Sequence, residues 1–225
     1  MITSENIAII VAHPDDEVLG CGGTIARLCE AGKKVHTIFL SDGETARYEA
    51  IASDIGKRQL SAVASSEALG SSRPYFLGFP DNEMDKIPLL TLVKALEKLL
   101  VEIKPDTIIT HHSGDLNIDH RLTFQAVMTA CRPQPGYFVK NILSCEVLSS
   151  TEWQAPGTTP FQPNFFFDIS KHFSAKLKAL KAYESEMRPA PHSRSLDNVE
   201  ALARFRGHAI GTKYAEAFIL HRCII

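Results

Sequence analysis

An alternation of short apolar runs with segments of helical periodicity constrains the fold of this chain more than any other feature. Short apolar runs are typical of buried strands, and apolar residues spaced three and four apart are typical of helices that cover a sheet. Strands and helices that alternate in this way form βαβ units with parallel strands and right-handed crossovers. The sequence therefore predicts an α/β fold with a mostly parallel central sheet. Predicted strands lie at 7–11, 35–40, 74–77 and 106–110, and predicted helices run through 24–31, about 50–69, 88–103 and 122–130.

The second half of the chain is less regular. A strand is predicted at 142–148 and another at 165–168, and helices are predicted from 170 to about 187 and from 195 to just before Gly207. No internal repeat, low-complexity tract or clear linker interrupts the sequence. We therefore expect a single domain that spans residues 1–225.

Charged residues follow the first predicted strand at the point where a helix begins. In open α/β sheets, ligand crevices form at this carboxyl end of the strands. His13 and Asp16 are three residues apart, so one turn can aim both side chains at a single point, while Asp15 points elsewhere. An imidazole, a coordinating carboxylate and a spare carboxylate suit a hydrolytic metal centre. The alternative is structural, because acids in the first turn of a helix complement the helix dipole.

A second polar loop, 111–121, follows the fourth predicted strand. Since parallel strands end at the same edge of a sheet, this loop opens onto the crevice that His13 faces. His120 can supply a third ligand, which gives the open site that is typical of catalytic zinc. Asp119, near the start of the next helix, can hydrogen-bond a neighbouring group. The alternative is a set of solvated histidines, but two histidine-bearing loops at one edge favour a metal site.

Composition narrows the range of functions. The formal net charge of -2 argues against nucleic acid or an anionic membrane as the main partner. The five cysteines are scattered and form no CxxC pair, which is typical of reduced thiols in a cytoplasmic protein. The N-terminus shows no signal-peptide pattern, and no stretch reaches transmembrane length without charges. We therefore expect a cytoplasmic protein that acts on a small molecule.

The segments 12–17 and 115–121 together resemble the metal-dependent N-deacetylases of the PIG-L/LmbE family. Several C-terminal segments, among them 191–195 and 214–218, look like a bacterial branch of that family. The resemblance implies a Rossmann-like three-layer α/β sandwich. It also implies zinc, with Fe2+ as the alternative, bound by three ligands, and Asp15 as general base. The implied ligands are His13, Asp16 and His120.

The resemblance further implies that Arg58 and Arg194 contact substrate and that Asp119 and the residue at position 117 take part in catalysis. Many family members carry a histidine where this chain has Asn117. An amide can donate a hydrogen bond to an oxyanion, but it cannot relay a proton. Proton delivery to the leaving amine then falls to Asp15 itself or to His192, if the C-terminal segment folds over the site.

The predicted reaction is therefore hydrolysis of an acetamido group on an N-acetylated sugar of the N-acetylglucosamine type. Three alternatives stay open: an amidase for a larger sugar conjugate, a 2-His-1-carboxylate iron oxygenase, and a nucleotide-binding Rossmann module. The last rests on the glycines of segment 20–23, which lack GxGxxG spacing. The resemblance also suggests a homo-oligomer.

Overall fold

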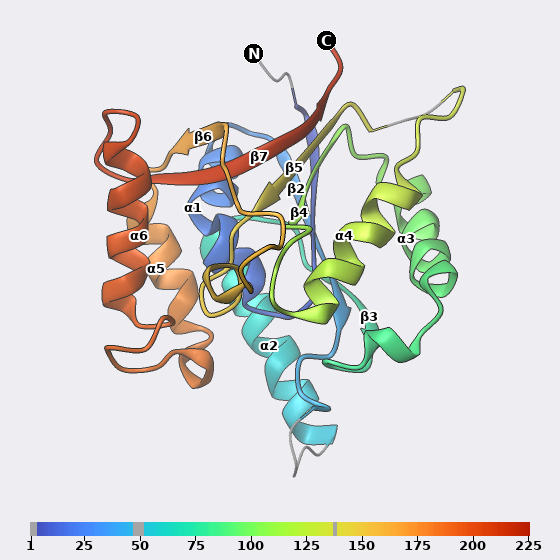
Figure 1. The fold of residues 1–225 in the computed structure, drawn as a ribbon, viewed down its shortest axis with the longest axis horizontal. Coiled ribbons are helices and arrows are strands. Elements are labelled where there is room, and N and C mark those ends of the chain that lie inside the picture. The colour runs from blue at the N-terminus through green and yellow to red at the C-terminus, as the bar shows by residue number, and fades with distance from the viewer. Residues whose placement is uncertain (1–3, 47–51, 137–138) are drawn as a thin grey trace.

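The computed structural model describes residues 4–46, 52–136 and 139–225. Its described strands form one seven-stranded sheet in the order β3-β2-β1-β4-β5-β7-β6 (Figure 1). The first five strands of this order are parallel, and β7 runs antiparallel to both of its neighbours. The α/β prediction with a mostly parallel sheet is confirmed. The strands are β1 (Asn6–Val11), β2 (Lys34–Ser41), β3 (Tyr75–Phe79), β4 (Thr107–His111), β5 (Asn141–Cys145), β6 (Phe165–Asp168) and β7 (Ala215–Cys223).

Helices cover both faces of the sheet and make it the middle of three layers (Figure 1). Burial on both faces explains why β1 is apolar throughout: Ile7, Ile9 and Val11 enter one core, and Ala8 and Ile10 enter the other. One face carries α1 (Asp16–Glu30), α2 (Ala52–Leu69), α5 (Phe173–Lys181) and α6 (Leu196–His208), and the other carries α3 (Leu89–Ile103) and α4 (Ile118–Ala130).

The structure corrects several predicted boundaries. The helix predicted through 24–31 already begins at Asp16, the predicted strand 142–148 ends at Cys145, and the helix predicted to about residue 187 ends at Lys181. The helix predicted through about 50–69 has its predicted start outside the described residues. Most of the segment 214–218, which no sequence pattern assigned to an element, lies in β7, which begins at Ala215.

The chain order places the edge where a site can form. From β1 the chain winds to β2 and β3 on one side and then crosses to β4 on the other, so β1 and β4 are neighbours at a topological switch point. Ligands of α/β proteins bind in the crevice at such a point, beyond the carboxyl ends of the strands. The loops after β1 and β4 are the two histidine-bearing segments.

Helix α1 is interrupted at Cys21, whose φ of −149° is not helical. The Glu216 carboxylate on β7 accepts hydrogen bonds from the backbone N–H groups of Gly23 (3.0 Å) and Thr24 (2.7 Å). Lys176 on α5 donates to the carbonyl oxygen of Leu19 at 2.9 Å and to Glu216 at 2.7 Å. A buried ion pair therefore satisfies the backbone groups that the break in α1 releases.

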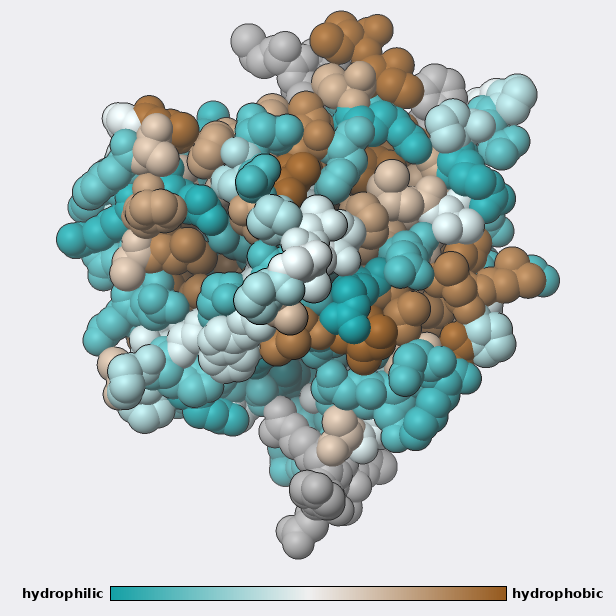
Figure 2. Space-filling view, viewed as in Figure 1, coloured by the Kyte–Doolittle hydropathy of each residue, from teal (hydrophilic) through white to brown (hydrophobic). Residues whose placement is uncertain are grey.

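The surface mixes hydrophilic and hydrophobic residues, with hydrophobic ones gathering over α3 at the right of the face shown in Figure 2. Leu90 and Val101 on this helix are 61% and 68% exposed. Within the described parts of the chain, no helix combines the length and the apolar character that a bilayer span requires.

Candidate metal centre and active site

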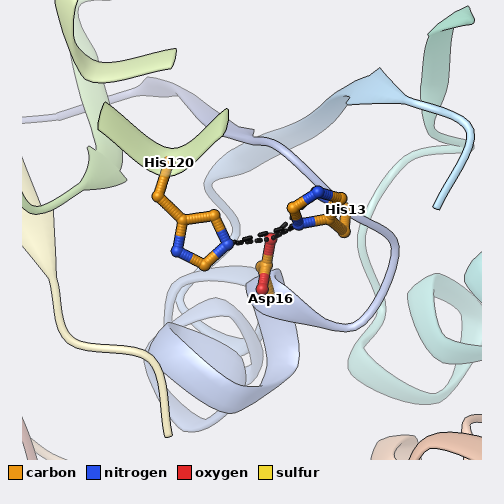
Figure 3. Close-up of side chains that lie close together, drawn as sticks. All are labelled: His13, Asp16 and His120. Carbon is orange, nitrogen blue, oxygen red and sulfur yellow. Dashed lines mark hydrogen bonds and ion pairs between the residues drawn. The ribbon is translucent and has the colours of Figure 1, made fainter. Parts of the chain in front are cut away.

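Three side chains from two distant segments converge beyond β1 and β4. His13 Nδ1, Asp16 Oδ2 and His120 Nε2 lie 3.2 Å from one another in all three pairs (Figure 3). Ligand atoms placed tetrahedrally about 2.0 Å from a zinc ion lie about 3.3 Å apart. The three atoms therefore fit a divalent ion, and the structure brings together the residues that were predicted as ligands.

A tight turn after β1 positions the first two of these side chains. The backbone N–H of His13 donates to Asp16 Oδ2 at 2.8 Å, and the backbone N–H of Asp16 donates to the carbonyl oxygen of His13 at 3.2 Å. Asp15, between them, has a φ of 132°, a value that side-chain-bearing residues seldom adopt. In this conformation the Asp15 carboxylate lies against Arg58 and Arg194, and strain of this kind is typical of functional sites.

His120 is oriented through its other ring nitrogen. Its Nδ1 lies 3.2 Å from Asp115 Oδ1, and the second Asp115 oxygen accepts a hydrogen bond from the Thr151 hydroxyl at 2.7 Å. Burial opposes ionisation of Asp115, but His120 and the hydroxyl donors hold the pKa of this carboxyl well below its usual range. A carboxylate at Nδ1 fixes the ring so that Nε2 faces the metal centre.

His13 is held in the same manner. Its Nε2 lies 3.1 Å from Asp81 Oδ1 and 3.3 Å from Asp119 Oδ2, so Nδ1 faces the centre. Burial lowers the pKa of His13, but these carboxylates and Asp16 outweigh burial and raise it. Asp119 also accepts the backbone N–H groups of Asn82 (2.7 Å) and Met84 (3.1 Å). Asp119 thus lies next to the metal centre, where sequence analysis expected it.

Asp15 follows in the same turn as the candidate ligands His13 and Asp16 and is buried. Its Oδ2 accepts a hydrogen bond from Arg194 Nη1 at 2.9 Å and lies 3.3 Å from Arg58 Nη2, whereas its Oδ1 is buried with no hydrogen-bond partner among the described residues. Burial raises the pKa of Asp15, and the two arginines oppose this rise. Both arginines also pair with Glu186, so they hold the predicted base in place.

Glu17, to which no role was assigned from the sequence, supports Asp15. The Glu17 carboxylate accepts hydrogen bonds from the Asp15 backbone N–H (3.0 Å), the Ser65 hydroxyl (3.1 Å) and the Tyr183 hydroxyl (2.8 Å). Burial raises the pKa of Glu17 to about 7. This bond to the Asp15 amide stabilises its strained conformation. Glu17 lies in the same charged turn as Asp15, which was the available signal.

His111 and Asp81 were also not predicted. The His111 ring stacks on that of His120, with centroids 3.7 Å apart, and its Nε2 accepts the Ala12 backbone N–H at 2.8 Å. Burial lowers the pKa of His111 to about 4, so this residue is a neutral packing partner of the ligand. Asp81 follows β3 at the same edge of the sheet, and that position could have identified it.

Asn117 caps α4 at the rim of the site. Its Oδ1 accepts the Asp119 backbone N–H at 2.8 Å, and its Nδ2 donates to Asn82 Oδ1 at 2.9 Å. His192 instead lines a separate hollow beside Trp153, and its Nδ1 accepts the Arg194 backbone N–H at 3.0 Å. The catalytic roles expected of Asn117 and His192 stay predictions.

A polar hollow of about 210 Å³ opens at the centre. It is lined by His13, Gly43, Ala46, Arg58, Asp81, Asn82, Asn117, Glu186 and Arg194.

The glycines of segment 20–23, which left a nucleotide-binding module open as an alternative, pack against protein side chains. A Cβ on Gly20 would lie 2.6 Å from the Cys145 sulfur, and one on Gly23 would lie 2.7 Å from the Ile169 side chain. Close packing therefore explains these glycines.

Comparison with known proteins places this chain in a family. The family model PIG-L, described as GlcNAc-PI de-N-acetylase, matches residues 8–131, which is more than half of the chain. The chain belongs to the PIG-L family, and the resemblance noted in the sequence is confirmed.

Several relatives match over most of their length. The "Uncharacterized deacetylase YaiS" of Escherichia coli is 29% identical over 80% of this chain and 91% of its own. The diacetylchitobiose deacetylase of Thermococcus kodakarensis is 26% identical over 97% of this chain and 86% of its own. A 4-oxalmesaconate hydratase of Pseudomonas putida is 27% identical over 80% of this chain and 74% of its own. The relatives of this chain therefore include proteins that are named for different reactions.

A solved structure agrees on the fold. The N,N'-diacetylchitobiose deacetylase of Pyrococcus horikoshii superposes with a TM-score of 0.78 at 23% identity and covers 98% of this chain and 85% of its own. Deacetylases among the homologues support an enzyme.

Proposed function

We propose that this protein is a zinc-dependent N-deacetylase, with Fe2+ as the alternative metal, that removes the acetyl group from an N-acetylated sugar. The observation that carries the proposal is the triangle of His13, Asp16 and His120 with the Asp15 carboxylate beside it. These three residues would hold a divalent ion, which would supply Lewis acidity toward the attacking water and the acetyl carbonyl.

The residues around the ligands supply the remaining functions. Asp15 accepts the proton of the attacking water as general base, and its unbonded Oδ1 is the atom available for this proton. The same carboxyl can return the proton to the leaving amine, and His192 is the second candidate for this step. The Asn117 side-chain amide has two N–H donors, and one of them binds Asn82. The second N–H can donate a hydrogen bond to the developing oxyanion.

The substrate class rests on the relatives named for N-acetylated sugars and on the polar lining of the hollow. Asp81 and Asn82 line this hollow and give it carboxylate and amide groups, which suit the hydroxyl groups of a sugar. Hydrolysis of a larger amide conjugate of such a sugar is the alternative. The cytoplasmic location and a homo-oligomeric state are further proposals that follow from the cysteine pattern and the family resemblance.

The test is acetate release from N-acetylglucosamine, diacetylchitobiose and N-acetylglucosamine conjugates. The protein is stripped of metal and then reconstituted with zinc or with iron(II), and the stripped protein is the control. The proposal predicts acetate and free amine in equal amounts from at least one substrate, and only after a metal is added. Equal turnover by the stripped protein, or release of a larger acid in place of acetate, would contradict it.

A further inference from the structure

The hollow at the metal centre carries two arginine side chains, Arg58 on α2 and Arg194 in the segment before α6. Arginine suits carboxylates and phosphates, because its planar group can donate two parallel hydrogen bonds to them. Two arginines in the lining of a pocket would therefore ordinarily indicate an anionic ligand. Whether they can bind one depends on the charges that already contact them.

Glu186 lines the same hollow and pairs with both arginines. Its Oε1 contacts Arg58 Nη1 directly, and its Oε2 lies 3.7 Å from Arg194 Nη1. Glu186 and Arg58 are each only 5% exposed, so salt in the solvent screens this pair little. Glu186 therefore takes up, inside the hollow, the cationic groups that an anionic ligand would need.

The other charged partners of the two arginines are carboxylates as well. Asp15 Oδ2 lies 2.9 Å from Arg194 Nη1 and 3.3 Å from Arg58 Nη2, and Glu44 Oε1 lies 4.0 Å from Arg58 Nε. Among the described residues, three carboxylates thus face two guanidinium groups. A ligand that brings a further negative charge into this cluster is repelled by the carboxylates, and such repulsion is a common source of specificity.

The backbone around Glu186 holds its side chain next to Arg58. Glu186 ends the short helical turn Glu184–Glu186, and its N–H donates to the carbonyl oxygen of Tyr183 at 2.9 Å. The Tyr183 ring is buried and packs against Arg58, whose guanidinium carbon lies 5.6 Å from the ring centroid. The negative charge of Glu186 is therefore a built-in part of the hollow.

We propose that Glu186 is a specificity-determining residue, which occupies Arg58 and Arg194 and so makes the hollow select uncharged substrates over those that carry a phosphate or a carboxylate near the acetamido group. The proposal rests on the proposed function and narrows its substrate class. In Glu186→Gln the side chain keeps its size and loses its charge, so the arginines become available to an anion.

The activity experiment compares N-acetylglucosamine with two anionic derivatives, N-acetylglucosamine 6-phosphate and N-acetylmuramic acid, in the metal-loaded enzyme. The wild type is expected to show a kcat/KM at least about tenfold higher for the neutral sugar, and Glu186→Gln is expected to reduce this preference by about tenfold for at least one derivative. A residue that only supports the fold would lower kcat/KM by the same factor for all three sugars. An unchanged preference in Glu186→Gln, or a wild type that prefers an anionic derivative, would overturn the proposal.

Glu184→Gln is the matched control. Glu184 belongs to the same turn and is exposed, so the variant removes the same charge without touching the arginines. It should keep the wild-type preference, and an equal shift in both variants would assign the effect to the net charge of the protein and overturn the proposal.

Two further variants separate charge from fold. Glu186→Asp keeps the charge and should keep the wild-type preference, whereas Glu186→Ala removes the charge and replaces the glutamine variant if that variant does not fold. Circular dichroism checks the fold of each. A preference that is lost in Glu186→Asp as fully as in Glu186→Ala would show that the length of the side chain, and not its charge, makes the selection.

Binding of inorganic phosphate tests the same claim without turnover. Calorimetric titration of the metal-loaded proteins should give a dissociation constant about tenfold lower for Glu186→Gln than for the wild type or Glu184→Gln. Phosphate held by the metal contributes to all three proteins alike, so the difference reports the arginines. Equal affinities, with acetate still released, would remove the charge selection and leave the function. Tighter phosphate binding by Glu186→Gln, with no acetate from any substrate, would remove the function and leave the charge selection.

Discussion

At the scale of single residues, Asp15 combines a strained backbone, two arginine partners and one unbonded carboxylate oxygen. In Asp15→Asn the amide can keep a contact to the arginines through its oxygen, but it cannot accept a proton. We expect turnover to fall by about a hundredfold or more, the usual contribution of a general base, with the metal content unchanged. Acetate assays and elemental analysis of the same sample test this. Undiminished acetate release would refute the role.

Glu17 acts on Asp15 through the backbone. In Glu17→Gln one acceptor becomes a donor, so the Asp15 N–H or one of the two hydroxyl groups loses its buried partner. We expect the free energy of unfolding to fall by about 1–3 kcal/mol and kcat to fall with little change in KM, because the base is displaced. Denaturant titration and steady-state kinetics give the two quantities, and Ser65→Ala, which removes only one donor, is the milder control. A variant with wild-type kcat would show that Glu17 does not position Asp15.

The cysteines supply a pH-dependent prediction away from the metal centre. Burial raises the pKa of Cys29 to about 11, whereas Cys223 is exposed. The thiolate is the reactive form, so at pH 8 about one Cys29 thiol in a thousand is ionised. We expect iodoacetamide to modify Cys223 first, and the rate at Cys29 to rise about tenfold for each pH unit up to about 11. Mass spectrometry of timed samples gives both rates. Fast modification of Cys29 at pH 8 would contradict the burial seen here.

At the scale of elements, the break in α1 connects the metal centre to the C-terminal strand. The Lys176–Glu216 pair is buried and holds both ends of the broken helix. Removing one partner of a buried pair leaves an uncompensated charge, so Lys176→Met and Glu216→Gln should each cost about 3–5 kcal/mol of stability. The double variant should cost less than the sum of the two. Chemical denaturation of all four proteins gives this cycle, and strictly additive losses would show that the two side chains act independently.

Strands were predicted correctly where a local run of apolar residues was enough to identify them. The apolar runs that became β1, β2 and β4 are buried on both faces, and such burial leaves a continuous apolar signal in the sequence. Strand β3, at the edge of the sheet, is only half-buried but keeps an apolar run. Strand β7 contains charged residues such as Glu216, which interrupt its apolar run. Its pairing with β5 joins positions far apart in the chain, so no local sequence pattern predicts this strand.

The candidate ligands His13, Asp16 and His120 could be predicted from their position after strands. Glu17 and His111 could not, because their roles depend on contacts that form only in the folded protein.

At the scale of the whole molecule, the metal would join two βα units that the sequence separates by about a hundred residues. A ligand that binds only the folded state stabilises it by about 4 kcal/mol at a thousand times its dissociation constant. We therefore expect chelation to lower the melting temperature by several degrees and added zinc to restore it. Calorimetry with and without chelator gives the shift, with His120→Ala as the control that should no longer respond. A wild-type melting temperature indifferent to chelation would argue against a metal bound by these units.

The most direct measurement is anomalous diffraction at the zinc absorption edge from crystals grown with zinc. The proposed metal site should give one strong peak that is within about 2.0–2.2 Å of His13 Nδ1, Asp16 Oδ2 and His120 Nε2, with Asp15 beside it and not bound to it. A peak that these three atoms do not share, or a well-ordered site that stays without a peak at saturating zinc, would contradict it.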